Sequence, residues 1–429
     1  MKSKNFKVVV LGCKVNTYEA ESVRCSLINK GYQETKDVAD IYVLFTCAVT
    51  NVAESKTRKK IRQIIRENNQ AIICVVGCYV QIKSNLSQLF PEVAIFVGSK
   101  DKDKIVNLIE EYELTKIKQF QVSELTNSLK FDNLPIQQFI SSNRAFLKIQ
   151  DGCNQFCSYC IIPYARGRER SMDFDEVLKQ AKSLSQNNPE IVLTGIHTGR
   201  YRANGKNLAD VIKKLLQLPD LKRIRISSIE ITEVTDEIIS LMATNLKIAR
   251  HLHIPLQSGN NHQLQDMNRP YTTEEFFSRI NYIKQQIPNI SISTDLIVGY
   301  PGETEADFLK TYDFVKQCSF SFLHIFPYAK KNQTKAALSQ HQVTEFIKKQ
   351  RVKKMLALSK MLYNNYKRQF INQKLEVLIE QTKNNQSFGH CSEYIPIYIS
   401  QAFSKNSFVS VRVIDLIDDK LQAIKWEEY

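Results

Sequence analysis

The eight residues Cys153–Cys160 read CNQFCSYC, which places three cysteines in the spacing C-x3-C-x2-C. A loop this compact can turn three thiolates toward one centre, and thiolates are the ligands that soft metals and iron–sulfur clusters select. A structural zinc ion normally takes four ligands, and the nearest downstream histidine is His197. A [4Fe–4S] cluster held by three cysteines would instead leave one iron free to bind a small molecule. The spacing therefore favours such a cluster over zinc and over incidental buried thiols.

Length and composition indicate a globular protein of two or three domains. The chain has 429 residues, of which 43% are hydrophobic. No run reaches the roughly 18 apolar residues of a membrane helix, and the basic N-terminus leads into a short strand-like run rather than a signal sequence. We therefore expect a cytoplasmic protein with no membrane contact. In that compartment the ten cysteines would serve metal or redox chemistry rather than disulfides.

The positive charge is concentrated in one short segment. The whole chain has a net charge of +15, and residues 330–369 contain eleven lysines and arginines and one acidic residue, Glu345. A basic segment of this density favours a polyanionic partner. A solvated helix face is the alternative explanation of the same pattern.

Residues 1–113 alternate short apolar runs with helix-length segments, which predicts a domain with a parallel sheet covered by helices. The strand candidates are 6–11, 41–45, 71–76 and 93–97, and the helix candidates are 18–29, 52–68, 81–89 and 101–113. Residues 114–142 are polar and weakly periodic, and we interpret them as a linker with an edge strand at 119–122.

Cys13, Cys47 and Cys78 each follow a predicted strand of this first domain. Because the carboxyl ends of parallel strands share one edge of a sheet, these cysteines are expected to converge there as a second set of three thiolates. The alternative is that one or more of them is a small hydrophobic residue. Cys25 and Cys74 fall within a helix and a strand, and we interpret them as core residues.

Residues 143–329 repeat strand and helix signals, which predicts a partial (β/α)6 barrel. The strand candidates are 145–150, 190–194, 223–228, 251–255, 291–298 and 320–326, and the helix candidates are 174–187, 208–216, 235–244, 273–286 and 305–318. Asp173, Thr272 and Thr304 are the expected N-caps. The loop Cys153–Cys160 follows the first strand, where such barrels place their chemistry.

Polar or glycine-rich segments follow four of the later barrel strands, and together with the cysteine loop they predict a cofactor-binding rim. Turns also use glycine and serine, so each segment alone is weak. The candidate cofactor-binding residues are Gly195, His197, Ser228, Glu230, Gln257 and Gly299. Glu303, in the same rim, is interpreted as a helix start.

The remaining residues predict a helix and a small β domain. Residues 330–369 form a basic helical segment whose helix spans 343–369, with Val352, Met355, Leu356, Leu358, Met361 and Leu362 on its apolar side. Residues 370–429 contain β runs at 375–379, 394–399, 408–414 and 421–426, which suit a small β-barrel. Such barrels often bind nucleic acid, but this segment is slightly acidic, and its aromatic residues are equally explained as a core.

Five motifs resemble those of the radical S-adenosylmethionine (SAM) methylthiotransferases, along nearly the whole chain. They are LGCKVN at 11–16, KIQDGC at 148–153, IPYARGR at 162–168, LTGIH at 193–197 and HLHIPLQSG at 251–259. They most resemble the subgroup that acts on threonylcarbamoyladenosine in tRNA. The resemblance implies a methylthiotransferase domain, a radical SAM barrel and a C-terminal TRAM domain.

The resemblance also implies the cofactors and the reaction. Cys153, Cys157 and Cys160 would hold a [4Fe–4S] cluster whose open iron binds SAM, and Cys13, Cys47 and Cys78 would hold a second [4Fe–4S] cluster. The reaction would convert N6-threonylcarbamoyladenosine at position 37, in the anticodon loop of tRNA, to its 2-methylthio derivative. Because the cofactors supply the chemistry, no side chain is assigned as a catalytic acid or base.

Other functions stay open from the sequence. The substrate could be isopentenyladenosine tRNA or a ribosomal protein, and a non-catalytic iron–sulfur protein that binds RNA is a further alternative. The basic segment 330–369 favours a tRNA substrate over a protein substrate, and it would share RNA binding with the C-terminal domain. The electron donor and the sulfur donor are not indicated by the sequence.

Overall fold

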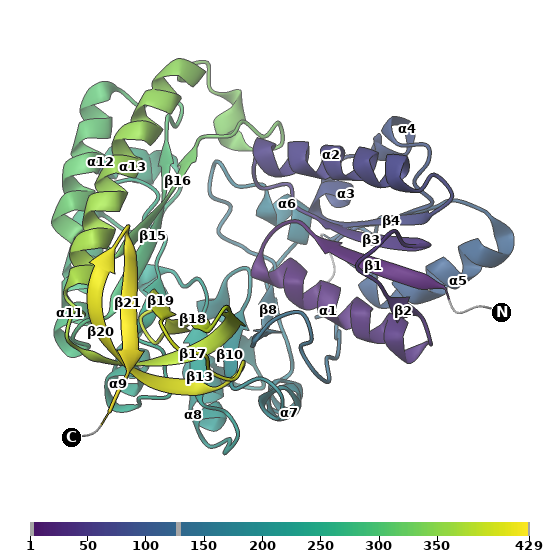
Figure 1. Ribbon diagram of the computed structural model, residues 1–429. Helices are drawn as coiled ribbons and strands as arrows, with labels where there is room; N and C mark the ends of the chain where they lie inside the picture. The colour runs from purple at the N-terminus through teal and green to yellow at the C-terminus, as the bar shows by residue number, and fades with distance from the viewer. Residues whose placement is uncertain (1–3, 126–129, 428–429) are drawn as a thin grey trace.

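The computed structural model describes residues 4–125 and 130–427. A layered sheet at the N-terminus is followed by an open central barrel and a closed C-terminal barrel, coloured from purple through teal and green to yellow in Figure 1. This is the α/β architecture that the sequence predicts. No helix among the described residues is long and apolar enough to span a membrane.

The N-terminal sheet is parallel throughout, with the order β2-β1-β3-β4-β5-β6. Helices α1 and α5 cover one face through apolar residues such as Leu27 and Ile109, and α2, α3 and α4 cover the other. The elements are β1 (Asn5–Val10), α1 (Lys14–Asn29), β2 (Gln33–Glu34), β3 (Ile41–Thr46), α2 (Asn51–Glu67), β4 (Ile72–Gly77), α3 (Cys78–Ile82), α4 (Leu86–Leu89), β5 (Ile95–Val97), α5 (Ile105–Thr115) and β6 (Gln119–Gln121).

The expected strands of this sheet are confirmed, but two helix predictions were wrong in detail. Helix α1 begins at Lys14 rather than at residue 18, because its first turns bury polar side chains such as Asn16 and Glu19, which an apolar pattern does not mark. The single helix expected at 81–89 is two short helices, because the backbone of Lys83 is extended (φ −106°, ψ 101°).

Six parallel strands form the open central barrel as two sheets, β7-β10-β13 and β14-β15-β16. Backbone bridges from Ile224 to Ile248 and from Ser228 to His253 join the two sheets. The strands are β7 (Arg144–Lys148), β10 (Glu190–Thr194), β13 (Arg223–Ile226), β14 (His251–His253), β15 (Ser291–Val298) and β16 (Phe322–Pro327). The partial six-stranded barrel is thereby confirmed.

Helices α7 (Phe174–Ser185), α8 (Leu208–Leu216), α9 (Asp236–Thr244), α11 (Thr273–Gln286) and α12 (Glu305–Cys318) follow the strands. Asp173, Thr272 and Thr304 cap three of them through side-chain oxygens, as expected. The shorter elements are β8 (Gln150–Asp151), α6 (Ile162–Arg166), β9 (Arg170–Ser171), β11 (Arg202–Ala203), β12 (Lys206–Asn207) and α10 (Asn261–Asp266). Helix α10 was not predicted because its six residues, NHQLQD, are mostly polar.

Helix α13 (Glu345–Arg368) lies against β16, and its buried face differs from the predicted one. Met355, Leu358 and Leu362 are buried as expected, but Leu356 and Met361 are 53% and 43% exposed. Their positions fall off the stripe of three- and four-residue spacings that faces the barrel. Lys348, Arg351, Ser359 and Lys367 occupy that stripe instead.

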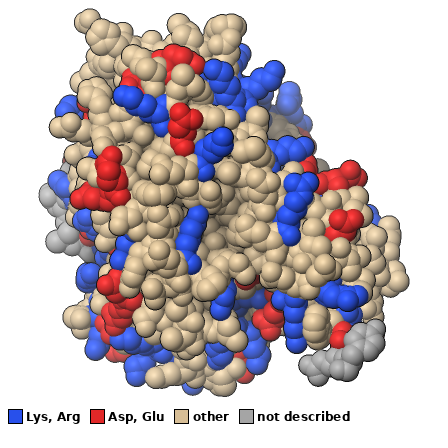
Figure 2. All heavy atoms as spheres, turned by 90° about the vertical axis from the view of Figure 1, so that its left-hand side faces the viewer, with Lys and Arg blue, Asp and Glu red and all other residues tan. Residues whose placement is uncertain are grey.

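The burial of these cations changes the meaning of the basic segment 330–369. Four of its cations, Lys331, Lys348, Arg351 and Lys367, are buried. Lys354 and Lys360 are paired with Glu305 and Asp419. Figure 2 shows basic and acidic side chains interspersed over this side of the molecule. Much of the local charge excess therefore serves the packing of α13 rather than an open polyanion site.

Residues after α13 form a closed barrel with the strand order β17-β18-β19-β21-β20. The strands are β17 (Lys374–Lys383), β18 (Gln386–Cys391), β19 (Pro396–Ile399), β20 (Phe408–Ile417) and β21 (Lys420–Lys425). Strand β18 was not predicted because its buried residues, Ser387, Gly389 and Cys391, are small. The core is aliphatic, and the rings of Phe388 and Tyr398 pack on each other at 5.1 Å while only half-buried.

Two arginines of β13 attach this barrel to the central one. Arg225 donates to Glu190 Oε1 at 2.8 Å and to the carbonyl oxygens of Ser392 and Cys391. Arg223 donates to the carbonyl oxygens of His390 and Glu376. Burial raises the pKa of Glu190, but Arg225 and Arg223 outweigh it and lower the pKa from 4.5 to about 2. This carboxylate therefore stabilises the fold fully above pH 4.5, and its contribution is lost as the pH falls toward 2.

Replacing Arg225 by methionine is expected to lower the free energy of unfolding by about 3 kcal/mol, because it weakens the pairing of a buried carboxylate and frees two buried carbonyls. Urea unfolding at pH 7 measures the change. The control is Lys213→Met, which removes an ion pair between half-exposed side chains and should cost less than about 1 kcal/mol. Equal losses in the two variants would contradict the role of Arg225.

Candidate metal centre and cofactor rim

The loop that carries Cys153, Cys157 and Cys160 lies between β8 and α6, directly after the first barrel strand. Gly152 begins the loop with a left-handed backbone (φ 73°), and a Cβ there would lie 2.0 Å from the carbonyl oxygen of Arg168. The amide of Cys153 donates to Gly167 O at 3.0 Å, so the loop is held close to the chain that follows α6. The sequence motif is thus a tightly folded turn, as its spacing predicts.

The three thiols of this loop share one environment. Burial, together with the neighbouring thiols of Cys157 and Cys153, raises the pKa of the Cys160 thiol to about 12. Arg269 Nη1 lies 3.5 Å from Cys157 Sγ. Three cysteine sulfurs within one loop are suited to a shared cationic centre, which removes the repulsion between their thiolates. The donor set therefore fits an iron–sulfur cluster.

His197, which was predicted as a cofactor-binding residue of the rim, lies beside Cys153. Its Nδ1 is 3.6 Å from Cys153 Sγ and 3.6 Å from Glu169 Oε1, and its Nε2 is 2.8 Å from Glu233 Oε1. Ligand atoms of Cys153, Glu169 and His197 all lie within 4.8 Å of one another, so zinc stays an alternative at this point. Burial lowers the pKa of His197, but its contacts with Cys153, Glu169 and Glu233 raise it to about 12. A protonated imidazole is a hydrogen-bond donor and not a metal ligand.

The second set of cysteines lies at one edge of the N-terminal sheet, at the carboxyl ends of three neighbouring strands. Cys13 is the N-cap of α1 after β1, Cys47 follows β3, and Cys78 begins α3 after β4. Burial, together with the neighbouring thiols of Cys78 and Cys13, raises the pKa of the Cys47 thiol to about 12. A Cβ at Gly12 would lie 3.0 Å from Cys47 Cβ, so only glycine lets the backbone pass there. The fold thus brings together three cysteines that lie far apart in sequence.

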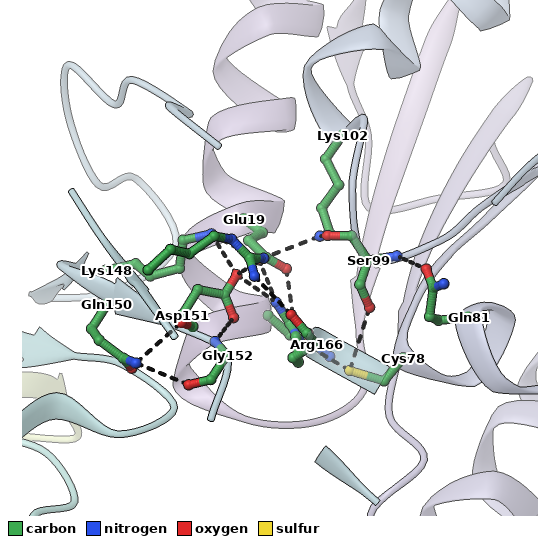
Figure 3. A network of polar contacts seen from close by, with 12 residues as sticks. Glu19, Cys78, Gln81, Ser99, Lys102, Lys148, Gln150, Asp151, Gly152 and Arg166 are labelled. Atoms are coloured by element: carbon green, nitrogen blue, oxygen red, sulfur yellow. Dashed lines mark hydrogen bonds and ion pairs between the residues drawn. The ribbon is translucent and has the colours of Figure 1, made fainter. Parts of the chain in front are cut away.

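Arg166 contacts Cys78 of the second set, as Figure 3 shows, and it follows Cys160 of the first set by six residues. This fully buried residue of α6 donates from Nε to Cys78 Sγ at 3.1 Å. Its other nitrogens donate to Glu19 Oε1 at 2.6 Å and to Asn16 Oδ1 at 2.7 Å. One guanidinium therefore holds α1 and Cys78 of the first domain against the chain that follows Cys160.

A second buried acid extends this network into the barrel (Figure 3). Asp151 pairs with Lys148 at 3.4 Å and with Arg170 at 3.1 Å, while Glu19 pairs with Lys148 and with Lys102. Burial raises the pKa of Glu19, but Arg166, Lys102 and Lys148 lower it to about 2. Among the described residues of the network, cations outnumber carboxylates, and the cation Arg166 contacts a sulfur of the second set.

The remaining candidate cofactor residues lie at the expected edge of the barrel. Gly195, Ser228 and Gln257 follow β10, β13 and β14, and Gly299 follows β15. Gln257 is held in a left-handed conformation (φ 70°) and bridges to Leu296 of β15. These positions agree with a rim, and their contact with a cofactor stays a prediction.

Glu230 and Glu303 are both held by arginines. The Glu230 carboxylate is ion-paired with Arg269, the residue that also contacts Cys157. Glu303 is not a helix start as interpreted, because α12 begins two residues later at Glu305. It is buried, accepts from the amide of Gly299 at 2.9 Å and pairs with Arg351 of α13. It therefore fixes the glycine turn after β15.

The sequence prediction missed four functional residues of this region. Arg166 and Arg269 each contact a cysteine sulfur, and Glu19 and Asp151 hold the buried cations. Arg166 lies in the quoted motif at 162–168, which was the available signal. Asp151 lies in the motif at 148–153, which gave the same signal. Glu19 and Arg269 carry no spacing that marks them, because their partners come from distant segments.

Comparison with known proteins follows this division of the chain. Residues 147–315 match the family model described as the radical SAM superfamily, and residues 5–98 match the uncharacterized protein family UPF0004. Among solved structures, radical SAM methyltransferase TsrM from Kitasatospora setae has a TM-score of 0.56 at 14% identity, over 78% of this chain and 77% of that one. That likeness concerns the fold.

Relatives in sequence cover most of the chain. A protein of Bacillus subtilis named threonylcarbamoyladenosine tRNA methylthiotransferase MtaB is 42% identical, over 90% of this chain and 88% of its own. The protein of the same name from Aquifex aeolicus is 38% identical, over 80% and 85%. A tRNA-2-methylthio-N(6)-dimethylallyladenosine synthase of Caldicellulosiruptor saccharolyticus is 32% identical, over 96% and 91%. The chain belongs to the radical SAM methylthiotransferase family.

Proposed function

We propose that this protein is a tRNA methylthiotransferase that converts N6-threonylcarbamoyladenosine at position 37 to its 2-methylthio derivative. The observation that carries the proposal is the pairing of two cysteine sets across one buried network, in which Arg166 contacts Cys78 and follows Cys160 by six residues. The relatives named for threonylcarbamoyladenosine are 42%, 38% and 33% identical, and those named for dimethylallyladenosine are 31–34% identical. The comparison favours the first substrate.

The cysteines would hold two [4Fe–4S] clusters. Cys153, Cys157 and Cys160 would bind the cluster that the radical SAM family implies, with SAM against the rim formed by Gly195, Ser228, Gln257 and Gly299. Cys13, Cys47 and Cys78 would bind a second cluster, which is the further part of this proposal. When bound, SAM and these clusters supply radical chemistry and sulfur for an adenine C2–H bond that acid–base catalysis does not activate.

The protein's own residues position and shield these groups. Arg269 and His197 lie against sulfurs of the first set, and Arg166 lies against one sulfur of the second. Cationic donors that are fixed before the cofactor binds stabilise negative sulfur without reorganisation. The burial of Arg166, Arg269 and Glu19 keeps water away from these contacts.

A tRNA partner is supported by the named relatives rather than by the basic segment. The anticodon loop presents unpaired bases and phosphates, which proteins bind by stacking and by cationic contacts. Phe156 and Tyr164, next to the cysteine loop, are exposed and contact each other edge to face, and Arg168 lies 4.7 Å from the Phe156 ring centroid. These three residues are a suitable surface for loop bases beside the first cysteine set.

The anaerobically reconstituted protein is expected to bind about eight iron atoms per chain, as two four-iron clusters. Cys153→Ala and Cys78→Ala should each lose about half of the iron, because each removes one ligand of a different cluster. Elemental analysis and absorption spectroscopy measure the loss. Cys25→Ala is the matched control on α1 and should keep all of it; a protein that binds zinc and no iron would contradict the proposal.

Replacing Arg166 by methionine should release the second cluster and destabilise the fold by about 3 kcal/mol or more, since it leaves the buried Glu19 with weaker partners. Iron content should fall by about half while the first cluster persists. Arg168→Met removes an exposed arginine of the same loop and serves as the control. Full iron content in both variants would show that Arg166 does not support the second site.

Deleting the gene should remove 2-methylthio-N6-threonylcarbamoyladenosine from tRNA and leave its unthiolated precursor in place. Mass spectrometry of tRNA nucleosides measures both. The wild-type gene should restore the modification, and the Cys153→Ala gene should not. If the deletion instead removed the methylthio group from isopentenyladenosine, the substrate would be isopentenyladenosine tRNA.

A further inference from the structure

The inner face of the second barrel sheet is lined by polar and aromatic side chains that no cysteine set uses. Successive residues of a strand point to opposite faces, and residues paired across strands share a face. Leu323 is buried on the outer face of β16, whereas Phe322 and Phe326, on the other face, are 37% and 39% exposed. His324 lies between them and is also exposed. This face of the strand is therefore open to solvent.

Three neighbouring strands contribute one compact polar group to this face of the sheet. His253 of β14 pairs across the sheet with Ser293, and Asp295 of β15 pairs with His324 of β16. His253 Nε2 lies 3.2 Å from Asp295 Oδ1, and its Nδ1 lies 2.9 Å from Ser293 Oγ. Ligand atoms of His253, Asp295 and His324 all lie within 4.8 Å of one another.

The group has neighbours in the cofactor rim and in the residue that follows Cys13. On one side, His253 bridges to Ser228, and Leu296, which follows Asp295, bridges to Gln257. On the other side is Lys14, the residue after Cys13, whose charge acts on both His324 and His251. A substrate atom between the two cysteine sets would thus have this group within reach of its substituents.

The chemistry of the group fits a short, polar and acidic substituent. The imidazole of His324 and the nearby Lys14 ammonium are donors for a carboxylate, and the partly exposed Asp295 carboxylate is an acceptor for a hydroxyl or ureido N–H. An isopentenyl group would leave these polar atoms desolvated and unpaired, which discriminates strongly against it. The rings of Phe322 and Phe326 flank the group on the same face.

We propose that His253, Asp295 and His324 form the subsite that binds the threonylcarbamoyl group of the substrate adenosine. The proposal rests on the proposed function and adds its specificity determinants. Asp295 and Ser293 orient the ring of His253, and His324 offers the more exposed nitrogen to the substituent. None of the three is placed as a proton donor or acceptor in the reaction itself.

The test compares two anticodon stem-loop RNAs that differ only at position 37, one with threonylcarbamoyladenosine and one with adenosine. Reconstituted protein with full iron content is used, and Kd and turnover are measured for both RNAs. His324→Leu and Asp295→Asn are each expected to weaken binding of the modified RNA about 10- to 100-fold. Binding of the adenosine RNA should stay unchanged, which a general structural defect would not allow. His262→Gln, on an exposed face of α10, is the control.

Different outcomes separate the two proposals. Wild-type protein that does not modify the threonylcarbamoyladenosine RNA would overturn the proposed function. Wild-type protein that modifies it while both variants keep the same preference for it would overturn the subsite alone. A stoichiometric divalent ion that is present in the wild type and absent from His324→Leu would also overturn the subsite, because the group would then be a metal site.

Discussion

The contact between Arg166 and Cys78 joins the chemistry of this protein to its architecture. A buried guanidinium needs several acceptors, and here they come from α1 and from the Cys78 thiol, which begins α3 after β4. Arg166 can reach them only if the N-terminal sheet sits over the open barrel. The same residue follows the first cysteine loop in sequence. One buried cation therefore constrains the domain contact and the relative position of the two cysteine sets.

Buried charge is used in the same way elsewhere in the molecule. Arg223 and Arg225 attach the C-terminal barrel through Glu190, and Arg351 and Lys348 of α13 lie against the glycine turn after β15. Each cation satisfies carbonyls or carboxylates contributed by another part of the chain, which polar groups require when they leave water. A high content of lysine and arginine is thus partly a consequence of packing three units together, and not only of binding RNA.

Strand and helix order could be predicted because each barrel helix has an apolar stripe and each strand a short apolar run. The failures occurred where burial is polar or small. Helix α1 buries Asn16 and Glu19, β18 buries Ser387, Gly389 and Cys391, and α13 buries Lys348 and Arg351 in place of Leu356 and Met361. Hydrophobic periodicity carries no information about such faces, because their partners are ionic groups or carbonyls from distant segments.

The sequence by itself determined the two cysteine sets, the strand ends that carry them, and the family to which the motifs belong. Local spacing and strand order are sufficient for those conclusions, since they depend on neighbours in sequence or on adjacent parallel strands. Only the tertiary structure decided which charges surround the sulfurs and which side chains face the barrel interior. The Arg269–Glu230 pair and the group of His253, Asp295 and His324 each combine residues from separate strands or loops. Their proximity follows from barrel closure, which no single segment encodes.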